Sequence, residues 1–272
     1  MTKMKFAAAI DYMKGILEPG QDSDYFHQFQ QRYVETLHLI PDVKEELRVL
    51  EIGAMFGHTS ILIKRIFNSE VYVTDFFDVW QERFRREGIN FSLCELTSQS
   101  LPFEDNSFDI VLFCEVIEHL FILPHLIFLD IRRVLKRNGL LILTTPNLYS
   151  VDKRICFLLG KRVTPRLTAN GDEVTAFHAI EKSCRDNTNL YELIQTRKFS
   201  GTHVREYDMA ELRSLLQETG FKISSARCLQ ADGIIPRING TRDFNPKRVF
   251  CRLLGKAYAP WGNQIFIAAQ KE

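Results

Sequence analysis

The sequence lacks the features that mark membrane-spanning proteins and disulfide-rich secreted proteins. No apolar stretch approaches the roughly 20 residues that a transmembrane helix needs, and the apolar run at residues 6–10 is too short for a secretory signal peptide. The six cysteines show no C-x-x-C spacing, so they do not suggest a disulfide framework and fit a reducing compartment. Together these absences predict a cytoplasmic protein without a transmembrane segment.

The chain also lacks a charge excess. Lys and Arg number 35 and Asp and Glu number 34 in 272 residues, so the field of the whole protein attracts no polyanion. No internal repeat, low-complexity segment or added RNA-binding module is recognisable, and nucleic acid is therefore not the expected partner. A hydrophobic content of 45% is enough for a substantial core, which predicts one globular domain with additions.

The most informative stretch is residues 47–60, which reads as a strand, a glycine turn and a helix. This is the opening of a βαβ unit, whose helix N-terminus offers free N–H groups. The dinucleotide pattern G-x-G-x-x-G fails here, because two of its glycine positions hold other residues. Glu51, Gly53 and Gly57 instead fit an acid followed by G-x-G-x-G, from which Met55 departs. A carboxylate at position 51 would repel a pyrophosphate but suits a ligand with an ammonium group, which favours S-adenosylmethionine.

Further stretches downstream agree with this interpretation. A second strand ends at Asp75, where a carboxylate can accept hydrogen bonds from both ribose hydroxyls. Three more motifs follow in order: LPFEDNSFDIVL at 101–112, EVIEHL at 115–120 and RVLKRNGLLILTTPN at 133–147. Together these motifs closely resemble the class I S-adenosylmethionine-dependent methyltransferases, densely over residues 45–150 and more loosely beyond.

The alternation of strands and helices predicts a doubly wound α/β sheet with its site at the carboxyl ends of the strands. The resemblance implies a seven-stranded, Rossmann-like sheet whose seventh strand is antiparallel. The expected strands cover 47–52, 70–75, 89–96, 108–114, 140–144, 221–229 and 263–270. The expected segments are an N-terminal helical segment (1–44), a cofactor-binding half (45–147), an insertion for acceptor recognition (148–200) and the C-terminal part of the same sheet (201–272).

The resemblance also implies a set of cofactor-binding residues: Glu51, Gly53, Ala54, Gly57, Asp75, Glu95, Cys114 and Glu115. Glu95 stands where the family usually places an acidic contact to adenine. In the motif at 115–120, the backbone of the first glutamate usually touches the cofactor and the histidine lines the pocket. His119 and His203 are the candidate catalytic residues, as general bases or as positioning groups for the acceptor.

A divalent metal site is a second interpretation of the motif at 115–120. Glu115, Glu118 and His119 have the spacing i, i+3, i+4, so a helix beginning right after residue 114 would place them on one face. With His203 they would offer two carboxylates and two imidazoles, a set that suits Mg, Mn or Zn. The Glu-x-x-Glu-His pattern resembles the ubiquinone-pathway and small-RNA O-methyltransferases, whose residues of this kind bind a divalent metal. The same motif also occurs in family members with no known metal, so both interpretations stay open.

Two segments mix basic and apolar residues. Residues 151–166 carry five basic residues and one acid, and residues 234–260 carry six basic residues against Asp243. A long segment after the fifth strand usually recognises the acceptor in this family, which suggests a small-molecule acceptor that is anionic or amphiphilic. The alternative is that both segments are solvated surface.

Three hypotheses follow for the function. The first is S-adenosylmethionine-dependent O-methylation of a hydroxyl on a small molecule, secondary metabolite or glycan, because an oxygen acceptor needs the proton removal that His119 and His203 could supply. The second is RNA 2′-O-methylation with a divalent metal, which would lower the pKa of the acceptor hydroxyl. The third is a catalytically degenerate scaffold that binds S-adenosylmethionine, with Met55 as the mark of a lost site.

Overall fold

The computed structural model describes residues 3–120, 122–163, 203–231, 237–238, 241–242 and 246–272. A seven-stranded sheet with the order β3-β2-β1-β4-β5-β9-β6 forms its centre. The strands are β1 (Leu47–Ile52), β2 (Ser69–Asp75), β3 (Asn90–Leu93), β4 (Phe108–Cys114), β5 (Leu135–Pro146), β6 (Phe221–Leu229) and β9 (Gln264–Lys271). The pairs among β1 to β5 are parallel, whereas β9 runs antiparallel to both of its neighbours. The doubly wound sheet with an antiparallel seventh strand is therefore confirmed.

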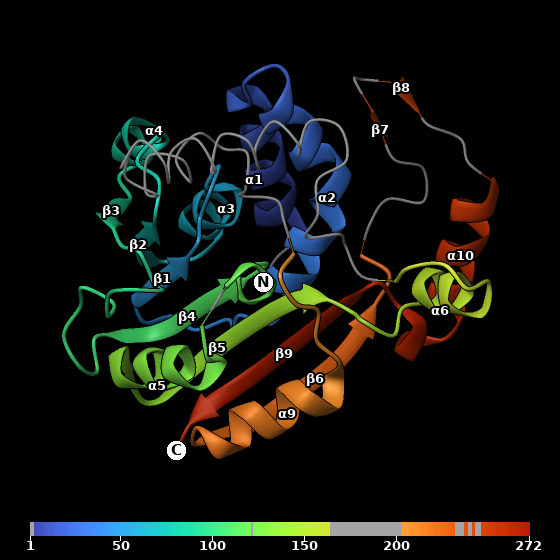
Figure 1. Ribbon diagram of the computed structural model, residues 1–272. Helices are drawn as coiled ribbons and strands as arrows, with labels where there is room; N and C mark the ends of the chain where they lie inside the picture. Colours follow the sequence, from blue (N-terminus) through green and yellow to red (C-terminus); the bar gives the residue numbers. More distant parts are fainter. Residues whose placement is uncertain (1–2, 121, 164–202, 232–236, 239–240, 243–245) are drawn as a thin grey trace, which may run out of the picture.

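Helices cover both faces of the sheet (Figure 1). One face carries α1 (Lys3–Ile16), α2 (Gln21–Leu37) and α3 (His58–Ile66), and the other carries α5 (Pro124–Val134) and α9 (Met209–Glu218). The short helix α4 (Gln81–Arg86) lies beside β3. Side chains alternate between the two resulting cores: in β1, Val49 packs with the α1–α3 layer, whereas Leu50 and Ile52 pack with the α5–α9 layer. A strand buried on both faces in this way reads as the continuous apolar run that predicted β1.

Helix α6 (Val151–Leu158) and helix α10 (Pro246–Ala257) pack against each other at the side of the molecule where β5 and β6 lead away from the sheet (Figure 1). The turn η2 (Ala259–Trp261) joins α10 to β9, and a small hairpin is formed by β7 (Arg237–Ile238) and β8 (Thr241–Arg242). The described part of the chain contains no helix long and apolar enough to cross a bilayer. Residues 164–200 of the predicted insertion lie outside the described residues.

A buried polar network joins the α2 layer to the glycine turn. Asp22, in the first turn of α2, binds His58 at the start of α3 with 2.6 Å between Oδ1 and Nε2. Its other oxygen accepts a hydrogen bond from Arg83 of α4 at 3.0 Å. On its far side, the His58 ring contacts the hydroxyl of Tyr33 at 2.9 Å. Asp22 thereby joins α2, α3 and α4.

Two expectations need correction. An α-helix was expected directly after residue 114, but the chain forms only the short 3-10 turn η1 (Ile117–His119), because Glu115 takes a left-handed φ of +57°. The fifth strand was expected over 140–144, but β5 is longer and extends from Leu135 to Pro146. Asp208 is the N-cap of α9, since its carboxylate accepts hydrogen bonds from the Ala210 and Glu211 N–H groups at 2.8 and 3.0 Å.

Candidate functional site

The glycine turn lies at the carboxyl end of β1, between that strand and α3. Glu51 is buried in the strand and accepts a hydrogen bond from the Ser60 hydroxyl of α3. Burial raises the pKa of Glu51 to about 7, and the hydrogen bonds from Ser60 and Thr59 only partly oppose this rise. The carboxyl group is therefore poised to change charge near neutral pH.

The two glycines of the turn are required by geometry. Gly53 and Gly57 have φ values of +74° and +75°, in the region that side chains rarely adopt. A Cβ atom at Gly53 would lie 2.4 Å from Val116 Cγ2, and one at Gly57 would lie 2.3 Å from a ring carbon of Phe84. Met55 also takes a positive φ, +46°, although it is not glycine. The turn therefore keeps the backbone course that the G-x-G-x-G pattern serves, despite the departure at Met55.

Asp75 at the end of β2 lies against this turn. Its Oδ2 accepts a hydrogen bond from the Met55 N–H at 2.8 Å, and its Oδ1 accepts one from the Phe77 N–H at 3.2 Å. Burial raises the pKa of Asp75, and these backbone donors counter the rise. A carboxylate offers about four acceptor sites, so capacity remains for the hydroxyls of a ribose.

The other predicted cofactor residues surround the same edge of the sheet. Ala54 is buried within the turn, where its carbonyl accepts a hydrogen bond from the Gly57 N–H at 2.7 Å. Cys114 ends β4, and burial raises the pKa of its thiol far above the usual range. Glu95 follows β3 and folds back on its own turn, where it accepts hydrogen bonds from the Thr97 N–H and hydroxyl at 3.0 and 2.7 Å.

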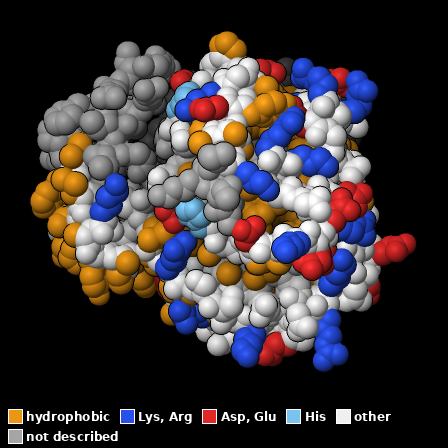
Figure 2. Space-filling view, turned by 180° about the vertical axis from the view of Figure 1, so that it is seen from behind, with side chains coloured by type: hydrophobic (Ala, Val, Ile, Leu, Met, Phe, Trp, Pro, Cys, Tyr) orange, Lys and Arg blue, Asp and Glu red, His pale blue; other side chains and the backbone are white. Residues whose placement is uncertain are grey.

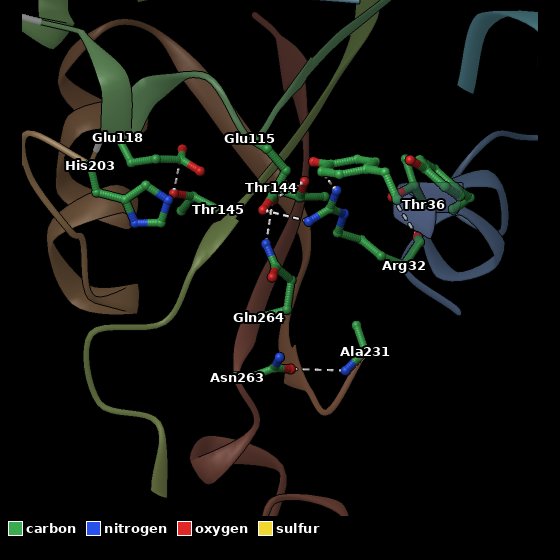
Figure 3. Close-up of polar contacts among 12 residues, drawn as sticks. Arg32, Thr36, Glu115, Glu118, Thr144, Thr145, His203, Ala231, Asn263 and Gln264 are labelled. Atoms are coloured by element: carbon green, nitrogen blue, oxygen red, sulfur yellow. Dashed lines mark hydrogen bonds and ion pairs between the residues drawn. The ribbon is translucent and has the colours of Figure 1, made fainter. Parts of the chain in front are cut away.

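Glu115 is held by residues from three separate elements (Figure 3). Its Oε2 lies 2.9 Å from Nη1 of Arg32, a buried residue of α2. Its Oε1 accepts hydrogen bonds from the Thr144 hydroxyl at 2.8 Å and from the Gln264 amide. Sequence analysis missed Arg32 and Gln264, because they are far from Glu115 in the chain and belong to no motif. The Arg32 guanidinium thus balances the negative charge of Glu115. The same ion pair holds α2 against the carboxyl edge of the sheet.

Glu118, His119 and His203 form a second cluster. One donor atom from each lies within 4.8 Å of the others, and the two imidazole centroids are 5.0 Å apart. The segment after His203 is attached to η1, because the Val204 and Arg205 N–H groups both donate to the Glu118 carbonyl, at 2.7 and 3.2 Å. The predicted proximity of the two histidine rings is therefore present. The role of these residues stays a prediction.

The cluster does not include Glu115, which corrects the expectation that four side chains converge on one point. Glu118 and His203 face each other on one side of β5, whereas the Glu115 carboxylate points toward α2 (Figure 3). The physical reason is the left-handed backbone of Glu115, which breaks the helical spacing on which the expectation depended.

Two residues that the sequence analysis missed hold His203 in place. Glu206 is buried, and its Oε1 lies 3.4 Å from His203 Nδ1. Its Oε2 binds the ammonium group of Lys153 in α6. Burial opposes the ionisation of Glu206, but the hydrogen bonds from His203 and Lys153 outweigh it and lower the pKa of the carboxyl. A buried, charged carboxylate beside Nδ1 favours the tautomer that leaves Nε2 of His203 as a proton acceptor.

This geometry agrees with a comparison of the sequence with protein-family models. Residues 50–143 match the model of a methyltransferase domain. The chain therefore carries a methyltransferase domain of the S-adenosylmethionine-dependent kind. S-adenosylmethionine is the cofactor of this family, and the matched residues include the glycine turn, Asp75 and the motif at 115–120 of this methyltransferase. The curated proteins that were compared contain no match to the chain.

Solved structures agree on the fold. The methyltransferase chain of a complex with the Haloferax volcanii Trm112 methyltransferase activator is 15% identical, with a TM-score of 0.58 over 99% of this chain and 97% of that one. An S-adenosylmethionine-dependent methyltransferase from Mesorhizobium loti is 13% identical, with a TM-score of 0.56 over 89% and 98%. The [4+2]-cyclase SpnF is 15% identical, with a TM-score of 0.53 over 98% and 92%. Because the cyclase shares the fold, the fold by itself does not fix the reaction.

Proposed function

We propose that this methyltransferase transfers the methyl group of S-adenosylmethionine to a hydroxyl oxygen of a small-molecule acceptor, such as a secondary metabolite or a glycan. The observation that carries the proposal is the pair of imidazoles, His119 and His203, 5.0 Å apart beside the carboxyl end of β4. A hydroxyl is a poor nucleophile until its proton is removed, and an imidazole near neutral pH can take that proton.

The reaction is an in-line displacement. The acceptor oxygen forms a bond to the methyl carbon while the bond from that carbon to sulfur breaks, and sulfur leaves with the electron pair as a neutral thioether. The hydroxyl proton passes to Nε2 of His203, and the Glu206 carboxylate stabilises the resulting imidazolium through Nδ1. Lys153 keeps Glu206 ionised for this task, since it binds the other oxygen of the carboxylate.

Cofactor binding is tested first. We expect Asp75→Ala to weaken the binding of S-adenosylmethionine by about 1.5–3 kcal/mol, measured by titration calorimetry, because charge-assisted hydrogen bonds are lost. Asp78→Ala is the matched control, since Asp78 is an exposed acid three residues further on. Equal affinities of the two folded variants would contradict the role of Asp75.

The transfer step is tested with cofactor that carries a labelled methyl group and a panel of hydroxyl-bearing acceptors. We expect an O-methylated product. We expect Glu206→Gln to lower turnover and to move the acid limb of its pH profile to lower pH, because the imidazolium loses its stabilising carboxylate, while cofactor affinity stays unchanged. A product methylated on nitrogen or carbon would overturn the choice of a hydroxyl acceptor.

A divalent metal is a second candidate feature of this pocket. Glu118, His119 and His203 offer one carboxylate oxygen and two imidazole nitrogens within 4.8 Å of one another. Oε1 of Glu118 is buried, and none of the described residues gives it a hydrogen bond. This donor set fits Mn or Zn, and a metal held there would lower the pKa of an acceptor hydroxyl. An RNA acceptor gains less support, because the charge of the whole chain is balanced.

The metal is tested without any acceptor. The purified protein should contain about one equivalent of metal by elemental analysis, and a chelator should lower its melting temperature. Glu118→Gln should abolish both effects. If the purified protein contained no metal and added Mn or Zn did not raise its melting temperature, the cluster would be left with a role in proton transfer alone.

A further inference from the structure

Two segments that look unrelated in the sequence form one surface in the structure. Helix α6 follows β5, and α10 comes about 90 residues later, yet the two helices pack side by side at one end of the molecule (Figure 1). The described parts of the basic and apolar segments at 151–166 and 234–260 therefore contribute to one surface.

This surface exposes large apolar side chains. At the end of α6, Phe157, Leu158 and Leu159 are 74%, 82% and 63% exposed. Phe250 and Leu253 of α10 are also more than half exposed. From the back, the molecule shows a broad hydrophobic area on the side where these helices lie (Figure 2). Exposed apolar residues on a soluble domain are normally scattered, so their concentration here indicates a docking surface.

The same helices concentrate positive charge. Residues 151–163 contain Lys153, Arg154, Lys161 and Arg162, and the sequence of α10 contains Lys247, Arg248, Arg252 and Lys256. Only one acid, Asp152, lies in the two stretches. Eight of the 35 basic residues but one of the 34 acids are thus found here, so the rest of the chain is acidic. Lys153 is engaged with Glu206, while Lys161, Arg162 and Lys256 are exposed.

We propose that α6 and α10 form a docking surface for an anionic lipid bilayer. Phe157, Leu158 and Leu159 would enter the boundary between headgroups and acyl chains, and the exposed Lys161, Arg162 and Lys256 would meet the lipid phosphates. Aliphatic side chains as exposed as Leu158 favour lipid over RNA, which binds cations together with aromatic stacking platforms. Lys153, on the inner side of α6, binds Glu206 beside His203, so docking would bring the histidine pair close to the membrane surface.

The proposal is tested by co-sedimentation of the full-length protein with lipid vesicles. Vesicles of phosphatidylcholine alone are compared with vesicles that contain about one third phosphatidylglycerol, at low and high salt. We expect binding to the anionic vesicles, and about tenfold weaker binding at high salt, because the attraction to surface charge is screened.

Three double variants separate the contributions. Phe157→Asp with Leu158→Asp should lower vesicle binding at least tenfold, as should Lys161→Glu with Arg162→Glu, since each cation near an anionic leaflet strengthens binding about fivefold. The matched control is Leu126→Asp with Leu129→Asp, because these leucines of α5 are also exposed but lie on another helix. It should bind vesicles like the unmodified protein. Melting temperature and affinity for S-adenosylmethionine should stay unchanged in all three, because every changed side chain is at the surface.

Several outcomes would overturn the proposal. One is equal binding to neutral and anionic vesicles, or binding that the α6 variants leave intact. Another is a dimer in sedimentation velocity that Phe157→Asp dissociates, since a second copy would then cover the surface. A third is binding of a single-stranded RNA oligonucleotide as tightly as anionic vesicles. If the Lys161 and Arg162 variant lost that binding, the surface would be assigned to RNA instead.

Discussion

Glu115 and Glu118 stand three residues apart at the carboxyl end of β4, yet their surroundings are opposite. Glu115 binds the Arg32 guanidinium, the Thr144 hydroxyl and the Gln264 amide, so its charge is matched. Glu118 is more deeply buried, and among the described side chains only the Thr145 hydroxyl, at 2.9 Å, donates a hydrogen bond to it. Burial raises the pKa of Glu118 well above its usual range, and the negative charge of Glu115 adds to the rise.

This difference indicates a structural role for Glu115 and a role in ligand binding or proton transfer for Glu118. A buried charge that is fully paired fastens elements together, and here it joins α2 to β4, β5 and β9. A buried carboxyl group with an unmatched oxygen, facing two imidazoles, is instead ready to bind a ligand or to exchange a proton. Two experiments test this contrast directly.

The largest effect is expected from Arg32→Met. It leaves the largely buried Glu115 carboxylate, whose side chain is 14% exposed, without its cation, so the free energy of unfolding should fall by about 3 kcal/mol. Urea denaturation measures the change. Arg227→Met is the control, because the pair of Arg227 with Glu35 is partly exposed at 3.3 Å and its removal should cost less than about 1 kcal/mol. Similar losses of unfolding free energy in the two variants would contradict the structural role of Glu115.

The next experiment makes the same substitution at both glutamates. Glu115→Gln leaves Arg32 buried without a counter-charge, and we expect a loss of about 2–3 kcal/mol in the free energy of unfolding. Glu118→Gln replaces a carboxyl group whose ionisation burial and Glu115 already oppose, so we expect a loss below about 1 kcal/mol. The two values come from urea denaturation at neutral pH. If Glu118→Gln proved the more damaging change, the contrast between the two carboxyl groups would be reversed.

A third buried carboxyl group, Glu51, lies between these extremes, since burial raises its pKa to about 7. The ionised form suits the ammonium group of S-adenosylmethionine, so affinity should be about tenfold higher at pH 8 than at pH 6. Calorimetry at the two values measures the difference, and Glu51→Gln should flatten it. An unchanged pH dependence in that variant would assign the titration to another group.

The same shift predicts the stability of the protein without cofactor. The folded state binds the Glu51 proton more tightly than the unfolded state does, because the pKa is raised from its usual 4.5. This contribution is complete below about pH 4.5 and is lost as the pH rises to about 7, by about 3 kcal/mol in all. Glu51→Gln should remove that slope.

The smallest effect is expected at Met55. Its φ of +46° is unfavourable for a side chain, and relief of that strain in Met55→Gly is offset by the greater freedom of glycine in the unfolded chain. The free energy of unfolding should change by less than about 1 kcal/mol, with cofactor affinity retained. Gly53→Ala is the contrasting variant, since its Cβ would collide with Val116. A large loss of affinity in Met55→Gly would show that the Met55 side chain itself contacts the cofactor.

The sequence predicted the elements whose signals are local. The bounds of β1, β4 and β6 agree with the strands expected at 47–52, 108–114 and 221–229. For β1 and β4, burial on both faces makes consecutive residues apolar. The N-cap at Asp208 is also a local feature, since its hydrogen bonds reach only two and three residues along the chain.

The side-chain contacts of the site could not be predicted from the sequence, because they depend on single torsion angles and on residues far apart in the chain. The left-handed φ of Glu115 changes where its side chain points, and no periodicity encodes one angle. Arg32 reaches Glu115 across 83 positions, and Glu206 gains its role only when α6 brings Lys153 against it. The metal hypothesis treated Glu115 and Glu118 as equivalent for this reason, although the fold gives them separate partners.

The placement of β9 has a consequence for how the protein is made. β9 lies between β5 and β6, so β6 joins the sheet only through a strand that follows it in the chain. During synthesis, the parallel half from β1 to β5 can assemble first. The backbone groups of β6 that pair with β9 stay without these partners until residues 264–271 have left the ribosome. The growing chain therefore exposes the edge of β5 and the apolar side of α9 to chaperones or to other chains for that interval.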